Sequence, residues 1–132
     1  MTPVVEDLYA YRWTPFLELF PIEGIDLTGA TLAMEVRPYR DAPGSALITL
    51  APAVSSAEGL SLSVATAGGI PTTTIAVRIN ETTIEALLPF PASGVEPGAN
   101  VSLVYDMHIT ATGLGKRRWF EGAFIVVPGV TH

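Results

Sequence analysis

The last third of the chain contains two long β-type runs, and this pattern constrains the fold more than any other feature. The runs are Val101–Thr110 and Arg118–Val127, and the turn between them reads ATGLGKR. Two runs rich in β-branched and aromatic residues, joined by a glycine-containing turn, are typical of a β-hairpin. The chain has 132 residues and no cysteine. A domain of this size can hold itself together with a packed core and without disulfides.

Short runs of alternating apolar and polar residues occupy much of the remaining chain. The clearest are Thr31–Arg37, Leu60–Thr66 and Thr72–Ile79, where every second residue fits a strand with one buried face. Phe16–Phe20 and Ala46–Leu50 are shorter runs, and 11 prolines and 12 glycines separate the segments. We therefore predict an all-β fold: a single antiparallel β-sandwich over residues 1–132, either immunoglobulin-like or a flattened barrel.

One stretch near residues 80–88 has helical spacing. Asn80 is a favourable N-cap residue, and Glu81 suits the positive end of a helix dipole. Apolar residues follow at helical spacing: Ile84, Leu87 and Leu88. Two prolines, Pro89 and Pro91, then end the stretch. We expect one or two helical turns that cover an end of the sandwich.

The N-terminal segment 1–13 contains the candidate interface residues. Tyr9, Tyr11 and Trp13 alternate, so an extended chain would place all three on one face. Core or arm packing is the favoured interpretation, with Trp13 at least partly buried, and an exposed interface or sugar-stacking strip is the alternative. The segment is predicted to be an N-terminal arm or an edge strand.

Charge and hydropathy restrict the classes of partner. The net charge is −6 and no basic stripe is present, which disfavours nucleic-acid binding. No apolar run is long enough to span a membrane, and the N-terminus lacks the basic and apolar regions of a signal peptide. Charged residues make up only 15% of the chain, which indicates either a neutral polar face or an apolar surface that partners cover.

Candidate catalytic groups are few. His108 shares a strand face with Asp106, and Glu121 could lie opposite on the partner strand, but a solvated face with cross-strand polar pairs is the favoured interpretation. Asp26, Asp41 and Asp106 are isolated in the sequence, so we expect no metal site and no cofactor.

One basic cluster stands out against the acidic composition. It consists of Lys116, Arg117 and Arg118, and it follows directly on Gly113–Gly115 in the turn of the expected hairpin. The favoured interpretation is a solvated turn, and the alternative is contact with an acidic patch on a neighbour.

Several segments resemble small proteins encoded among the structural genes of tailed phages and prophages. These are IDLTGATLAMEVR from Ile25 to Arg37, INETTIEALLP from Ile79 to Pro89, and the closing VYDMHIT and FEGAFIVVPG with Val130-Thr131. The resemblance implies a virion or tail-associated component related to immunoglobulin-like modules of baseplates and fibres. It carries over no catalytic residue.

The same motifs also have local folding explanations. Asp26 and Thr28 can bond nearby backbone amides in a turn where Gly29 takes a positive φ. The ring of Tyr105 can be buried while its hydroxyl finds a backbone partner at the sheet edge. Gly122 within a strand predicts a bulge or a close approach by a neighbour.

The leading hypothesis is a non-enzymatic, virion-associated structural or accessory protein of a phage or prophage tail, baseplate or fibre. It would act by protein–protein assembly with other virion proteins or with itself, and it would reside in the virion or, before assembly, in the host cytoplasm. The alternative is a carbohydrate-binding β-sandwich with the N-terminal aromatics as its platform. A small barrel enzyme is the least favoured class.

Overall fold

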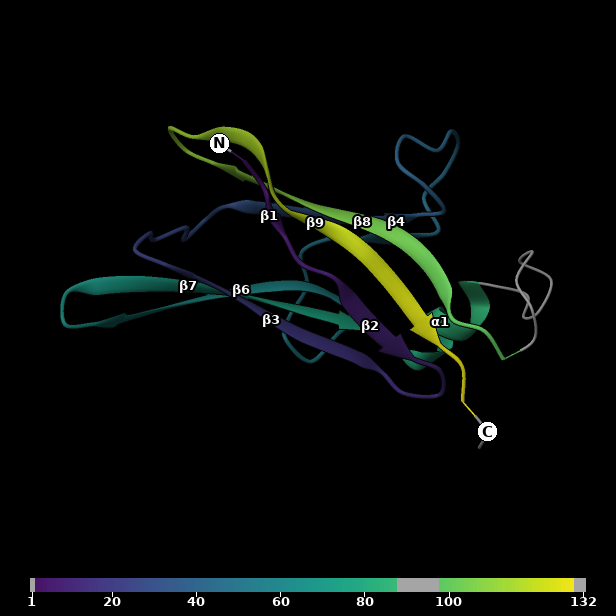
Figure 1. Cartoon of the computed structure of the whole chain (residues 1–132). Helices are drawn as coiled ribbons and strands as arrows, with labels where there is room; N and C mark the ends of the chain where they lie inside the picture. Colours follow the sequence, from purple (N-terminus) through teal and green to yellow (C-terminus); the bar gives the residue numbers. More distant parts are fainter. Residues whose placement is uncertain (1, 88–97, 130–132) are drawn as a thin grey trace.

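Alternating apolar residues in this chain form two β-sheets whose buried faces meet (Figure 1). The structure is a computed structural model that describes residues 2–87 and 98–129. Its elements are β1 (Val4–Val5), β2 (Leu8–Tyr11), β3 (Phe16–Glu23), β4 (Thr31–Arg37), β5 (Ile48–Leu50), β6 (Gly59–Ala67), β7 (Ile70–Ile79), α1 (Glu81–Leu87), β8 (Val101–Ala111) and β9 (Gly115–Val127). The prediction of an all-β sandwich with one short helix is confirmed.

The strand order is that of an immunoglobulin-like sandwich. The six-stranded sheet has the order β1-β9-β8-β4-β5, with β2 also on β9, and the three-stranded sheet has the order β3-β7-β6. A central trio of β4, β8 and β9 facing a sheet of β3, β7 and β6 is the immunoglobulin-like arrangement. The expected hairpin is present as β8 and β9, which pair from Val101 opposite Val126 to Ala111 opposite Gly115.

The N-terminal segment is an edge strand, and its parallel pairing is a local addition to a sandwich whose other strand pairs are antiparallel. Strands β1 and β2 run parallel to β9, with Val4 opposite Phe120 and Leu8 opposite Phe124. A parallel pair cannot be joined by a tight turn. Here nearly the whole chain separates the two strands, so the parallel direction needs no special connection.

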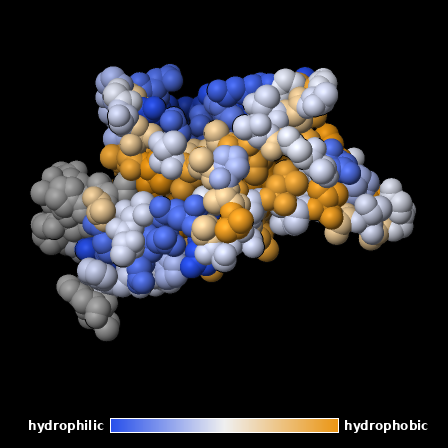
Figure 2. Space-filling model, turned by 180° about the vertical axis from the view of Figure 1, so that it is seen from behind, coloured by the Kyte–Doolittle hydropathy of each residue, from blue (hydrophilic) through white to orange (hydrophobic). Residues whose placement is uncertain are grey.

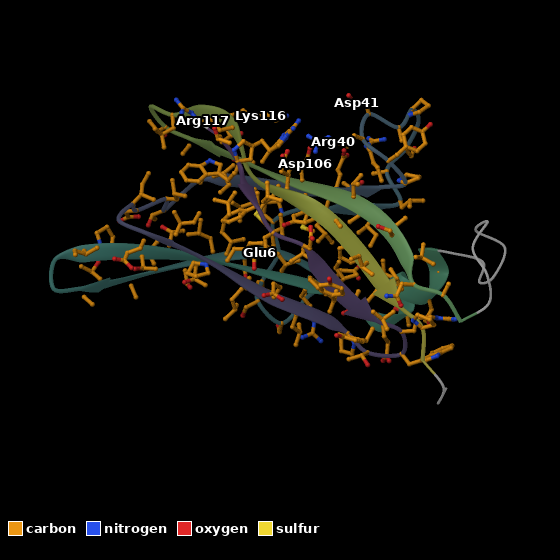
Figure 3. All side chains as sticks on the ribbon, in the orientation of Figure 1. Glu6, Arg40, Asp41, Asp106, Lys116 and Arg117 are labelled. Carbon is orange, nitrogen blue, oxygen red and sulfur yellow. The ribbon has the colours of Figure 1, made fainter. Side chains whose placement is uncertain are left out.

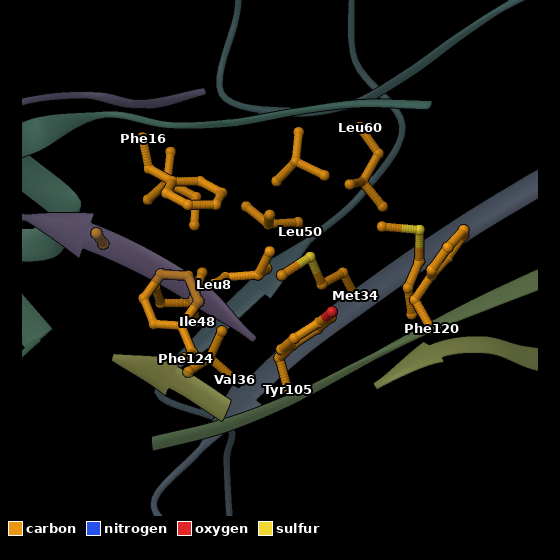
Figure 4. Close-up of a cluster of buried hydrophobic side chains, with 14 of the residues drawn as sticks. Leu8, Phe16, Met34, Val36, Ile48, Leu50, Leu60, Tyr105, Phe120 and Phe124 are labelled. Atoms are coloured by element: carbon orange, nitrogen blue, oxygen red, sulfur yellow. The ribbon is translucent and has the colours of Figure 1, made fainter. Parts of the chain in front are cut away.

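Aromatic contacts between β3 and β9 join the two sheets. The rings of Phe16 and Phe124 lie 5.4 Å apart between centroids, and those of Phe20 and Phe120 lie 4.8 Å apart, both tilted. Tilted pairs at these distances contribute about 0.5–1.5 kcal/mol each beyond their burial. Aliphatic side chains from β4, β5, β6 and β8 fill the space around them (Figure 4).

Helix α1 lies at one end of the sandwich (Figure 1). Ile84 is fully buried in the shared core, and the carbonyl of Asn80 accepts hydrogen bonds from the amides of Thr83 and Ile84. The predicted short helix and its start are therefore confirmed, while Leu88, Pro89 and Pro91 lie outside the described residues. Across the two described ranges, no helix has the length and apolar character needed to cross a membrane.

The Asp-Leu-Thr-Gly turn before β4 is fixed both locally and by the core. The carboxylate of Asp26 accepts hydrogen bonds from the amide and hydroxyl of Thr28, and these hold the pKa of Asp26 below its ordinary value. Gly29 has φ +82°, as predicted. The hydroxyl of Thr73 on β7, which is fully buried, accepts a hydrogen bond from the amide of Leu27.

A close backbone approach fixes the break between β1 and β2. The Tyr105 hydroxyl donates a 2.6 Å hydrogen bond to the carbonyl of Glu6, and the amide of Ala123 donates to the carboxylate of Asp7. A Cβ on Gly122 would lie 2.4 Å from the Glu6 carbonyl oxygen. The expected backbone partner for Tyr105 and the close approach at Gly122 are therefore both confirmed.

We expect Gly122→Ala to destabilise the protein by about 1–3 kcal/mol, because the added methyl group forces the N-terminal strand away from β9. Urea denaturation of the full chain measures this loss. Ser102→Ala, an exposed position on the neighbouring strand β8, is the control and should stay within about 0.5 kcal/mol of the wild type. Equal stability of the two variants would contradict the steric account.

The pKa of Tyr105 predicts a loss of stability in alkali. Burial, followed by the nearby charges of Glu6 and Asp7, raises the pKa of the Tyr105 hydroxyl. A phenol with a raised folded-state pKa contributes stability that is complete below its unfolded value of about 10 and falls as the pH rises further. Urea denaturation at several pH values between about pH 8 and pH 11 measures the free energy of unfolding. This free energy should decline less with pH in Tyr105→Phe than in the wild type, whereas Tyr39→Phe should show the wild-type decline. An unchanged slope in the Tyr105 variant would exclude this group as the cause.

Candidate functional site

The outer face of the six-stranded sheet carries the densest group of functional side chains in the described part of the chain. Charged side chains gather at outward positions of β4, β8 and the first half of β9, among smaller neutral ones, and the outward positions at the end of β9 are apolar. Figure 2 shows hydrophilic residues gathered along the top of the molecule, between two raised ends. This charged half forms a cavity of about 290 Å³, which we call the charged cleft; its charged lining residues are Glu35, Arg37, Arg40, Asp41, Asp106, His108, Arg118 and Glu121.

A β-bulge in β9 determines which side chains enter the charged cleft. Met107 pairs with Phe120, but the next residue, His108, pairs with Arg118, so Trp119 is an extra residue in β9. In a regular strand, Arg118 and Glu121 would point to opposite faces, because side chains alternate. The bulge turns them to the same face, where Arg118 Nη1 lies 3.1 Å from Glu121 Oε1.

Ion pairs connect the strands across the charged cleft. Glu121 forms ion pairs with both Arg118 and Arg40, the latter at 3.2 Å. Asp106 forms an ion pair with Arg118 at 3.4 Å, and its carboxylate lies 3.6 Å from His108 Nε2. Glu121 lies directly opposite Asp106 in the register, as the sequence suggested. Figure 3 shows Arg40 close to Asp106 on this side of the sheet.

Arg37 ties the loop after β4 to the sheet and so places Arg40. Its Nη1 donates to the carbonyls of Ala42 and Gly44 at 2.9 and 2.8 Å, and its Nη2 lies 3.1 Å from Glu35. Asp41 in this loop has φ +58°. The sequence pattern did not identify Glu35, Arg37 or Arg40 as members of a functional site. The alternation of Thr31–Arg37 was the available signal for the first two, whereas the loop residue had none.

The chemistry available to the charged cleft is mainly electrostatic. His108 lies on the same face as Asp106, as expected, with a side chain that is 29% exposed. Asp106, which lies beside it, already pairs with Arg118, and Glu121 pairs with both Arg118 and Arg40. Within residues 2–87 and 98–129, no group of three or more histidine or carboxylate side chains is arranged to hold a metal ion.

Tyr9 and Tyr11 lie at the other end of the same outer face. They are 51% and 55% exposed and lie beside Ile125 and Val127 of β9 in the register. We call these four residues the aromatic patch. The favoured expectation of core or arm packing is wrong for both tyrosines, because Leu8 and Ala10 occupy the inward positions of β2. Their role as an interface stays a prediction.

Trp13 does not continue this face. Strand β2 ends at Tyr11, and Trp13 takes φ +68° in the turn that follows. Its ring is partly buried and lies under the guanidinium of Arg12 at 4.8 Å, which in turn pairs with Glu85 of α1. The structure therefore separates Trp13 from the two tyrosines because the chain has to turn toward β3, and its expected partial burial is confirmed.

The basic cluster in the β8–β9 turn is divided between solvent and cleft. Lys116 and Arg117 are exposed at the end of the hairpin (Figure 3), where Arg117 donates to the carbonyl of Leu114. Only Arg118 reaches the charged cleft. The solvated-turn interpretation fits the first two residues; Arg118 is also exposed, but the bulge places it in ion pairs with Asp106 and Glu121.

We expect Glu121→Gln to cost about 1 kcal/mol of stability, because its side chain is 17% exposed and pairs with two arginines. Glu35→Gln is the matched control: its side chain is 43% exposed and pairs with Arg37, so its cost should stay below about 0.5 kcal/mol. Urea denaturation at low and high salt measures both, and the Glu121 effect should shrink with salt. Equal losses in the two variants would contradict the ranking.

Comparison with known proteins assigns no family to this site. No protein-family model matches the chain, and no curated protein matches its sequence. The function of the outer face therefore has to be inferred from the arrangement of its own residues.

Proposed function

We propose that this protein is a non-enzymatic structural or accessory component of a phage or prophage virion, acting in the tail, baseplate or fibre region. It works by docking onto other virion proteins through the outer face of the six-stranded sheet. The observation that carries the docking role is the aromatic patch. Its two tyrosines lie on the edge strand β2, are more than half exposed, and lie beside Ile125 and Val127 of β9. The virion setting rests on the resemblance of the Asp-Leu-Thr-Gly turn and the closing strands to phage structural proteins.

The composition of this face supports a protein partner. Exposed tyrosines are favoured at the centre of protein interfaces because they bury a large area with few rotatable bonds. The charged cleft at the other end of the same face adds arginines and carboxylates that can select a partner by charge. Together they give one face with an apolar anchor at one end and polar groups at the other, and interfaces combine both kinds of contact.

The pairing of charges in the cleft supports a non-enzymatic role. A carboxylate that acts as a general base has to be free to take a proton from a bound substrate. Here Arg118 and Arg40 engage the carboxylates of Asp106 and Glu121. The cavity of about 290 Å³ also lies at the lower limit of the usual volumes of small-molecule sites.

A carbohydrate-binding module is the second candidate. Tyr9 and Tyr11 project from the same face two residues apart and are exposed, as a platform for stacking sugar rings requires. This alternative predicts binding to a glycan with no protein partner involved.

We expect the double variant Tyr9→Ser with Tyr11→Ser to bind its virion partner about 10- to 100-fold more weakly, because two anchoring rings are lost. The measurement is co-assembly of the purified chain with the products of the neighbouring structural genes, followed by calorimetry of the complex that forms. Deleting segment 1–13 is less informative, because β2 buries Leu8 and Ala10 in the core. Ile70→Ser, at an exposed apolar position in the β6–β7 hairpin, is the control and should bind normally.

Two results would count against the proposal. Mass spectrometry of purified particles from the same genome could find no trace of the chain, which would remove the virion role. A glycan array could instead show binding that the tyrosine variant loses, which would favour the carbohydrate module.

A further inference from the structure

The outer face of the three-stranded sheet differs sharply from that of the six-stranded sheet. The register of β3, β7 and β6 gives fourteen outward positions, four from β3 and five from each of the other two strands. Only Glu23 and Arg78 among them are charged, and the others are small, hydroxyl-bearing or aliphatic. We call this surface the neutral face. It has no counterpart to the ion pairs of the charged cleft.

The neutral face exposes two leucines beside a groove. Leu17 and Leu19 of β3 are 60% and 63% exposed. They line a groove of about 610 Å³ together with small side chains such as Ala76 and Ala57, and the charged residues Glu18 and Arg78 also line it. Small side chains next to large exposed ones give a surface into which another sheet can pack closely.

The two charged residues of the neutral face lie at opposite ends and have no partner. Arg78 is in register with Leu17, and its Nε atom is buried without a hydrogen-bond partner among the described residues. Glu23 is in register with Thr72 at the other end, and none of the described residues forms an ion pair with it. Six residues separate Arg78 from Thr72, so the two charges lie about 20 Å apart along the strands.

We propose that the neutral face binds the same face of a second copy of this chain, about a twofold axis that runs across the strands. This axis reverses the strand direction of the second copy. It brings the Arg78 end of each copy over the Glu23 end of the other, so that Arg78 of the central strand β7 lies diagonally across from Glu23 of the facing β3, and the leucines of β3 pack over β3 of the opposed face. A twofold interface uses one patch on both subunits, and a patch with one cation and one anion at its two ends is self-complementary. The alternative twofold axis, along the strands, would place Arg78 against Arg78.

The free edge of β3 is a poorer contact than its face. Pro21 lies within this edge strand and Pro15 directly precedes it. Proline has no amide hydrogen, so within a sheet it occupies the unpaired side of an edge strand. By alternation, the backbone of residues 15, 17, 19, 21 and 23 faces outward, and the two prolines among them leave only the N–H groups of Leu17, Leu19 and Glu23. An added strand would therefore find few donors, which favours packing of face on face.

The size of the neutral face sets the strength of the dimer. Three strands about 4.8 Å apart and eight residues long cover roughly 25 Å by 10–15 Å. This is smaller than the ~800 Å² per partner of a standard interface, so the dimer is expected at protein concentrations on the order of 100 μM. The proposal is independent of the virion role, because it uses the opposite sheet.

A charge exchange tests the proposed pairing. Arg78→Glu and Glu23→Arg should each weaken the dimer at least about tenfold, because like charges then face each other. The variant that carries both changes should recover dimer formation to within about threefold of the wild type. Sedimentation equilibrium from about 10 μM to about 500 μM measures the association. Lys116→Glu, on the far side of the molecule, should change nothing.

Chemical crosslinking gives a second readout that leaves both charges in place. The chain has no cysteine, so Ala76→Cys introduces a single thiol near the middle of the neutral face. A short bismaleimide should link two copies of this variant, whereas Ala33→Cys, exposed on the outer face of β4, should remain unlinked. A wild-type monomer throughout the concentration range, a double variant that fails to recover, or equal linking at both thiols would overturn the proposal.

Discussion

The aromatic contacts between β3 and β9 join the two sheets, and most other features depend on the strand that supplies one ring of each pair. Phe120 and Phe124 point inward from β9 to Phe20 and Phe16. The backbone of the same strand pairs with β8 on one side and with β1 and β2 on the other. Strand β9 therefore holds the N-terminal segment, the closing hairpin and the opposite sheet in one arrangement. A change that moves β9 moves both the core and the outer face above it.

Two irregular positions in β9 convert this scaffold into a specific surface. The extra residue at Trp119 places Arg118 on the face of Glu121, which allows the ion pairs of the charged cleft. Three residues later, Gly122 admits the backbone of Glu6, so the edge strand can break there and resume as β2. The first irregularity builds the charged end of the outer face, and the second positions Tyr9 and Tyr11 at its other end.

The two outer faces have different physical characters and suit different contacts. Five of the seven cations lie on β4, β9 or the loop after β4, so the six-stranded sheet can select partners by charge. The three-stranded sheet keeps one cation and one anion among small and aliphatic residues. A charged face is discriminating in its partners, because a mismatched charge is costly to desolvate. A neutral face with leucines gains mainly from burial of apolar area. An assembly protein that contacts itself through one face and a different partner through the other would use this division.

The sequence by itself determined most of the strands, the short helix and the buried side of the alternating strands β4, β6 and β7, because alternation and helical spacing are local properties. It also determined the Asp26–Thr28 turn, the burial of Tyr105 and the tight fit at Gly122. It did not determine that β2 runs parallel to β9 or that Trp13 leaves the face of the tyrosines. It also gave no sign that Arg118 joins Glu121. These features depend on contacts between residues far apart in the chain and on one extra residue in β9. A single bulge reverses the side-chain directions of the residues beyond it, relative to a strict alternation. Only the tertiary structure could decide them.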